Sequence, residues 1–173
     1  GSIAGLAVSA DGAHVYALLS DGSHYNGYDA DEYLMAVSLL ELDALTMEVT
    51  RRLDIHSWEA GDPESRMARY LAWSPGMDVL AASLGSGGNG HRGSSNELWF
   101  IDVETMTAID TNPDTADVAD PVVLPAQGYG EQMVWEGGYV IVGHNTKNAP
   151  LDRIAQLSFV DGATYEVTTV TPP

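Results

Sequence analysis

The chain has 173 residues, of which 45% are hydrophobic, and its formal net charge is −18 because 25 Asp and Glu face only 7 Lys and Arg. Such a charge repels phosphate backbones and anionic lipids, so we expect no nucleic-acid binding. No apolar run approaches the ~18–20 residues that span a membrane, so we expect no membrane insertion.

Alternation of apolar and polar residues dominates the chain and predicts strands, and no segment carries a sustained helical stripe. The first unit has strands at residues 3–9, 14–20, 33–42 and 47–55, and Ala10-Asp11-Gly12 forms its first turn. The second unit has strands at 67–74, 78–84, 97–102 and 106–110, followed by a loop at 111–130. The third has strands at 131–136, 139–144, 153–160 and 164–170.

One short phrase recurs at an equal spacing of 59 residues. In each copy an Asp that ends a strand is followed three residues later by a Thr: Asp43 and Thr46, Asp102 and Thr105, Asp161 and Thr164. An Asp in this position accepts backbone N–H groups of the next residues, and the Thr hydroxyl braces the same bend. We therefore expect structural turns here and not a triplicated carboxylate active site.

The repeat predicts an all-β fold made of β-propeller blades, each a four-stranded antiparallel meander of roughly 58 residues. The whole chain is then a single propeller-type unit with blades at about 3–57, 58–115 and 116–173. We expect Trp73, Trp99 and Trp135 to be core aromatics between blades.

Two phrases carry a resemblance to a known group of folds: Gly5-Leu6-Ala7-Val8-Ser9-Ala10-Asp11-Gly12 and Leu42-Asp43-Ala44-Leu45-Thr46. They resemble the blades of YVTN-type and lactonase-like propellers and, more loosely, of esterase-like phytase propellers. The Tyr-Val-Thr-Asn tetrapeptide itself is absent from this chain. The resemblance implies a propeller superfold and maps no family's catalytic residues onto this sequence.

Three blades are too few to close a ring, since closed propellers have ~4–8. The chain is then a half-propeller or a segment of a larger ring. Its expected partner is a second copy, which would close a six-bladed ring, or the missing blades of a larger propeller. The absence of Cys is compatible with export, and we expect an extracellular or periplasmic location. The signal segment that such a location requires is not present in this chain.

The long loops opposite the Asp-x-x-Thr turns hold the candidate site residues, since repeat arrays concentrate function on such loops. Hard oxygens gather within seven residues and predict a calcium site at Asn26, Asp29, Asp31 and Glu32. Four histidines in or beside these loops are candidates for a transition metal: His24, His56, His91 and His144. Aromatic and basic residues of the same loops are candidate ligand contacts: Tyr25, Tyr28, Trp58 and Arg92.

The sequence favours a binding or scaffold module that acts through this His- and Asp-rich loop face, with calcium as the one suggested cofactor. The alternative is a metal- or calcium-dependent hydrolase of lactonase or phytase type. Neither a nucleophile elbow nor a Cys is available for covalent catalysis, so the sequence identifies no catalytic residue.

Overall fold

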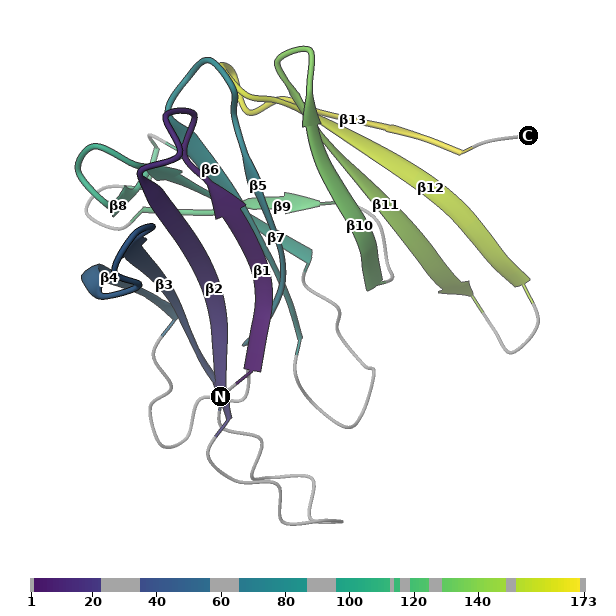
Figure 1. The fold of residues 1–173 in the computed structure, drawn as a ribbon. Coiled ribbons are helices and arrows are strands. Elements are labelled where there is room, and N and C mark those ends of the chain that lie inside the picture. Colours follow the sequence, from purple (N-terminus) through teal and green to yellow (C-terminus); the bar gives the residue numbers. More distant parts are fainter. Residues whose placement is uncertain are drawn as a thin grey trace.

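The computed structural model describes residues 2–22, 35–56, 66–86, 96–112, 114–115, 119–124, 129–148 and 152–171. These residues form strands and turns arranged as three antiparallel sheets that stand side by side (Figure 1). Within the described part of the chain, no helix has the length and apolar character needed to cross a membrane.

The first and third sheets are four-stranded meanders, as the sequence predicted. The first contains β1 (Ser2–Val8), β2 (His14–Gly22), β3 (Met35–Asp43) and β4 (Val49–His56) in that order. The third contains β10 (Tyr129–Glu136), β11 (Tyr139–Asn148), β12 (Asp152–Asp161) and β13 (Val167–Val170). The fold is therefore all-β, and its sheets have the strand order of propeller blades.

The second sheet differs from the prediction at its outer edge. It contains β5 (Arg66–Trp73), β6 (Val79–Ser86), β7 (Asn96–Asp102) and a fourth strand, β8, reduced to Thr107–Ala108. The remaining edge of β7 pairs with β9 (Val122–Leu124), which lies in the segment expected to be a loop. The outer position of this blade is thus shared between two short strands, because β8 covers only the last two residues of β7.

The repeated aspartates form Asx turns after β3, β7 and β12. The Oδ1 atom of Asp43 accepts bonds from the N–H groups of Leu45 and Thr46 at 2.9 and 2.8 Å and from the Thr46 hydroxyl at 3.1 Å. Asp102 accepts the N–H and hydroxyl of Thr105, and Asp161 accepts the N–H groups of Ala163 and Thr164. The residue that follows each Thr has a positive φ: Met47, Met106 and Tyr165.

The three sheets pack on one another through two hydrophobic cores, and the second sheet lies between the first and the third. One core joins sheets one and two through side chains such as Leu18, Leu39 and Leu80, and Trp73 and Trp99 pack against it. The other joins sheets two and three and includes Trp135. The innermost strands of sheets one and two also meet closely, since a Cβ added at Gly5 would lie 2.7 Å from the backbone nitrogen of Leu71.

Equivalent positions of the repeat differ in exposure according to the neighbours of their sheet. Met106, just after the second Asx turn, packs into the core toward sheet one and is 6% exposed, whereas Met47 at the same point of sheet one is 58% exposed. Trp73 and Trp135 likewise pack toward the preceding sheet, and their equivalent Val8 is exposed. The face of sheet one that points away from sheet two, here called the first outer face, thus presents Leu6, Val8 and Met47 to water.

The opposite end of the stack shows the same effect. Ala7 and Ala72 on the first strands of sheets one and two are buried against the following sheet, but their equivalent Val134 is 52% exposed. Its cross-strand neighbour Ile141, then Phe159, and the half-exposed Leu157 continue this surface. We call the surface formed by these last four residues the second outer face.

Candidate functional site

Most of the site residues expected from the sequence lie outside the described part of the chain. These are His24, Tyr25, Asn26, Tyr28, Asp29, Asp31, Glu32, Trp58, His91 and Arg92. His56 ends β4 opposite Val37, and His144 lies within β11 opposite Gln156 and not in a loop. Among the described residues no group of three or more His, Asp or Glu is placed to hold a metal ion.

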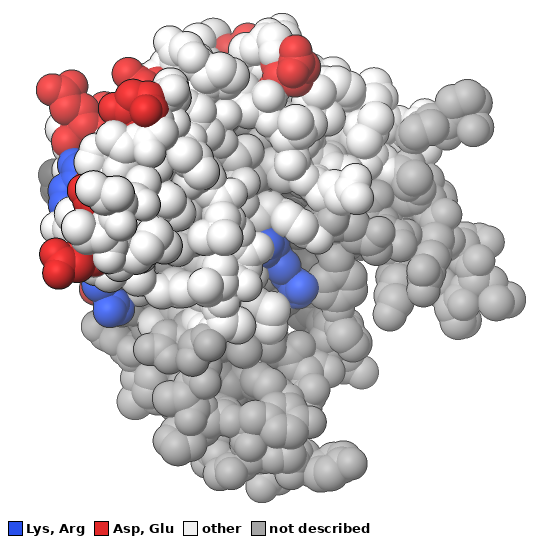
Figure 2. Space-filling model, viewed as in Figure 1, with Lys and Arg blue, Asp and Glu red and all other residues white. Residues whose placement is uncertain are grey.

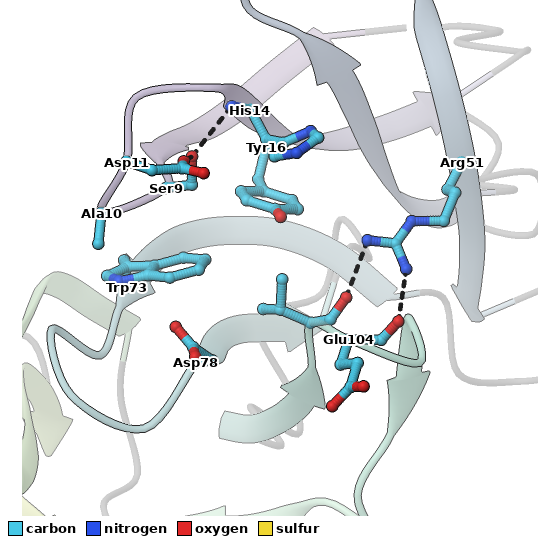
Figure 3. Close-up of a pocket in the computed structure, with 10 residues that line it drawn as sticks. Ser9, Ala10, Asp11, His14, Tyr16, Arg51, Trp73, Asp78 and Glu104 are labelled. Atoms are coloured by element: carbon cyan, nitrogen blue, oxygen red, sulfur yellow. Dashed lines mark hydrogen bonds between the residues drawn. The ribbon is translucent and has the colours of Figure 1, made fainter.

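The described residues line an open cavity of about 390 Å³ between sheets one and two, at the end of the molecule where the hairpin turns lie (Figure 3). Sheet one contributes Ser9, Asp11, His14, Tyr16 and Arg51, and sheet two contributes Trp73, Asp78, Val103 and Glu104. This end, formed by the six turns between paired strands, is here called the turn face. It lies at the other end of the strands from Gly22, His56 and Ser86, the last described residues before the segments that hold most of the site residues expected from the sequence.

The turn between β1 and β2 fixes one side of the cavity. The Ser9 hydroxyl donates to Oδ1 of Asp11 at 2.6 Å, and the same oxygen accepts the N–H of Ala13 at 2.9 Å. The N–H of His14 in turn donates to the Ser9 hydroxyl oxygen at 2.9 Å. These bonds, first that of Ser9, hold the pKa of Asp11 below its usual value, so Asp11 is an anion at the cavity rim.

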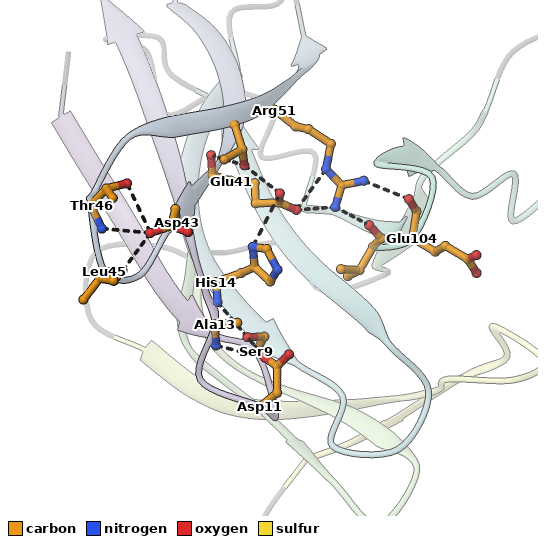
Figure 4. A network of polar contacts seen from close by, with 12 residues as sticks. Ser9, Asp11, Ala13, His14, Glu41, Asp43, Leu45, Thr46, Arg51 and Glu104 are labelled. Atoms are coloured by element: carbon orange, nitrogen blue, oxygen red, sulfur yellow. Dashed lines mark hydrogen bonds and ion pairs between the residues drawn. The ribbon is translucent and has the colours of Figure 1, made fainter.

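A buried carboxylate, Glu41, lies behind the cavity wall (Figure 4). Arg51 donates to it through Nε at 3.0 Å and also through Nη2, and the Thr50 hydroxyl donates at 2.6 Å. The Nδ1 atom of His14 lies 3.6 Å from the other carboxylate oxygen of Glu41. Burial acts to raise the pKa of Glu41, but the bonds from Arg51 and Thr50 outweigh it, and the net pKa is lowered.

Arg51 also fastens the first sheet to the second. Its Nη1 donates to the carbonyl oxygen of Glu104 at 2.8 Å, and its Nη2 donates to that of Val103 at 2.9 Å. The guanidinium therefore makes four hydrogen bonds, two to Glu41 and two to the turn after β7. Its positive charge is paired with the carboxylate of Glu41.

An aromatic pair forms the apolar wall. The rings of Tyr16 and Trp73 are stacked with centroids 5.5 Å apart and planes inclined by 24°. Burial, then the charge of Glu41, raises the pKa of Tyr16 to about 12, so the phenol is neutral at physiological pH. Asp78 lies across the cavity from Tyr16, in the turn between β5 and β6, at a φ of 52°.

Carboxylates dominate the turn face as a whole. Each of its six turns carries at least one Asp or Glu and none carries a Lys or Arg: Asp11, Asp43, Glu48, Asp78, Asp102, Glu104, Glu136, Asp161 and Glu166. Figure 2 shows the acidic residues gathered toward this end of the molecule. The cavity therefore opens into a region of negative potential.

Sequence reasoning did not identify this site, although one signal pointed to it. Glu41 stands in the inward register of β3 after Val37 and Leu39, where an apolar residue is expected. A charge in that register requires a buried partner, and Arg51 on the next strand supplies it.

Comparison with known proteins adds little. No protein-family model matches the chain, and no curated protein does. Among solved structures, a chain of Kuenenia stuttgartiensis hydrazine synthase is similar over 98% of this chain, with 12% sequence identity and a TM-score of 0.40. The match covers 49% of that chain, so this protein spans about half its length. A likeness at this level assigns neither fold nor function.

Proposed function

We propose that this chain is a binding and scaffold module that forms half of a six-bladed β-propeller, and that a second copy supplies the other half. The observation that carries the proposal is the exposure of repeat positions on the two outer faces. Positions that are buried or partly buried where a neighbouring sheet exists are more open to water where the stack ends. The likeness of the hairpin phrases to YVTN-type and lactonase-like blades supports the same proposal.

The outer faces have the chemistry of blade interfaces. Leu6 and Val8 on the first outer face are 60% and 55% exposed, and Val134 on the second is 52% exposed. Covering such side chains fully contributes about 1.5–3 kcal/mol each. A cavity of about 370 Å³, lined in part by Val134, Ile141 and Leu157, adjoins the second outer face and offers space for side chains of another blade.

A second copy of the chain would cover both outer faces of the first. If the first outer face of one copy packs on the second outer face of the other, a twofold axis repeats the contact and closes the ring. Six blades fall within the usual range of ~4–8, and the closed ring leaves neither outer face in water. The hydrolase alternative has no observation among the described residues in its favour.

The test is the mass in solution of matched Val→Asp variants, measured by light scattering. We expect the wild type to be a dimer and Val134→Asp to be a monomer, because the new charge would be buried in the ring contact. Val123→Asp is the control: Val123 is also exposed, at 64%, but it lies on β9 of the middle sheet. It should remain a dimer. A monomeric wild type at tens of micromolar would overturn the proposal.

A further inference from the structure

The interface between sheets one and two, here called the first interface, has different residue types from the interface between sheets two and three, the second interface, at positions around the cavity. The strand registers and the equal spacing of the Asx turns make three positions of sheet one equivalent to three of sheet two. The pairs are His14 and Val79, Tyr16 and Ala81, and Glu41 and Phe100.

The second interface shows what the fold requires at these positions. There the ring of Phe100 packs edge-on against Trp135, with centroids 5.8 Å apart, and at a tilt against Tyr165, with centroids 4.9 Å apart. All three rings belong to one apolar core. The first interface instead holds the buried Glu41 and leaves a cavity of about 390 Å³. A buried ion pair stabilises a fold no better than apolar packing of the same volume, so stability does not explain the exchange. Such local departures from a consistent pattern are typical of functional sites.

The chemistry of the cavity selects a cation with an apolar body. The partly exposed ring of Trp73 offers aromatic surface, which attracts cations through its negative face, and the buried ring of Tyr16 stacks against it. Three acidic residues, Asp11, Asp78 and Glu104, are among those that line the cavity. Among the described residues, Asp78 and Glu104 form no ion pair with a Lys or Arg, since Arg51 is engaged by Glu41.

We propose that this cavity binds an alkylammonium group, presented either by a free amine or by a lysine side chain of a partner protein. Its volume lies within the range of small-molecule sites, ~300–1,000 Å³. The acidic turn face raises the local concentration of cations and repels anions. Because one chain builds the whole cavity, the inference goes beyond ring closure and does not depend on it.

The test is calorimetric titration of the full chain with Nα-acetyl-lysine methylamide and with n-pentylamine, using Nα-acetyl-norleucine methylamide as the neutral control. We expect the two cations to bind and the norleucine derivative not to bind. The double variant Asp78→Asn/Glu104→Gln should weaken binding about tenfold, because it removes the negative charges of two residues that line the cavity. Its matched control is Glu136→Gln/Glu166→Gln, which removes two exposed charges from the turns of sheet three and should leave binding within about twofold.

The results also distinguish the source of the ammonium group. Tighter binding of a Gly-Gly-Lys-Gly-Gly peptide than of pentylamine indicates a protein partner, and equal or weaker binding indicates a free amine. Absence of binding by both cations overturns the proposal. So does equal binding of the norleucine derivative, or an equal loss in both double variants, since the latter shows only a diffuse charge effect. The oligomeric state is not a readout here, so failure of this test leaves the ring proposal untouched.

Discussion

Replacement of Arg51 by Met tests whether the ion pair of Arg51 with Glu41 and its hydrogen bonds to sheet two stabilise the packing of the first two sheets. The substitution keeps an apolar stem but removes both bonds to Glu41 and both bonds to the turn after β7. The Glu41 side chain, 4% exposed, then keeps its charge without a cationic partner. Its remaining donors include the hydroxyl of Thr50.

The expected loss follows from that burial. Breaking a fully buried ion pair by removing one partner costs about 3–5 kcal/mol. Because the Arg51 side chain is 37% exposed, water can reach the vacated space, and Thr50 still donates to Glu41. We therefore expect Arg51→Met to lower the free energy of unfolding by about 2–3 kcal/mol.

The neighbouring arginine provides a matched control. Arg52 pairs with Asp54 at 2.7 Å, but both side chains are more than half exposed. Arg52→Met should therefore cost less than about 1 kcal/mol. The double variant Glu41→Met/Arg51→Met should recover most of the loss, because no buried charge is left unpaired.

The assay is urea unfolding at pH 7 and at one fixed protein concentration, with linear extrapolation. A stabilising role of the Arg51–Glu41 pair is refuted if the unfolding free energies of Arg51→Met and Arg52→Met differ by less than about 0.5 kcal/mol. It is also refuted if the double variant is as unstable as Arg51→Met alone. Either result would mean that Glu41 is not held in the folded state as a buried, paired anion.

Three further predictions concern the close contact between sheets one and two, an Asx turn and the buried tyrosine of the cavity wall. Gly5→Val should lower the unfolding free energy by about 1–3 kcal/mol in the same assay, because its Cβ would lie 2.7 Å from the Leu71 nitrogen; wild-type stability would contradict the close approach. Hydrogen bonds from the N–H of Thr105 and then from its hydroxyl lower the pKa of Asp102 below its usual value of 3.8. The ionised Asp102 therefore stabilises the folded state fully above pH 3.8, and this contribution to the unfolding free energy is lost as the pH falls through the lowered pKa. Asp102→Asn should therefore make the unfolding free energy fall less steeply as the pH is lowered. An unchanged pH dependence would contradict the hydrogen bonds between Asp102 and Thr105. In an ultraviolet titration of the phenol groups one ionisation should lie near pH 12, and Tyr16→Phe should abolish that step. A titration curve that Tyr16→Phe leaves unchanged would place Tyr16 outside the core.

The turns and most strands were predictable because their signals are local. Asp43 and Thr46 lie three residues apart and bond each other directly, so their spacing alone predicts the bend. The alternating pattern gave strands such as β2 and β7 to within two residues at each end. The three-residue β9 could not be predicted in this way, because it exists only through its pairing with β7.

The cavity was hidden from sequence reasoning for a related reason. Its lining comes from turns that lie far apart in the chain and meet only when sheets one and two pack, as Asp11 and Glu104 do. The equivalence of Glu41 with Phe100 becomes visible only when the repeats are aligned on their Asx turns. The sequence instead directed attention to the polar long loops, whose candidate residues lie mostly outside the described chain.

Directed disulfide crosslinking tests ring closure most directly, because the chain contains no Cys of its own. Within the molecule Trp73 stacks on Tyr16, and the positions equivalent to these two on the outer faces are Val8 and Ile141. Head-to-tail closure brings Val8 of one copy to Ile141 of the other. Ring closure predicts that Val8→Cys/Ile141→Cys oxidises to a covalent dimer of twice 18.4 kDa, while Val8→Cys alone does not crosslink. A covalent dimer from Val8→Cys alone, or none from the double variant, would contradict the ring.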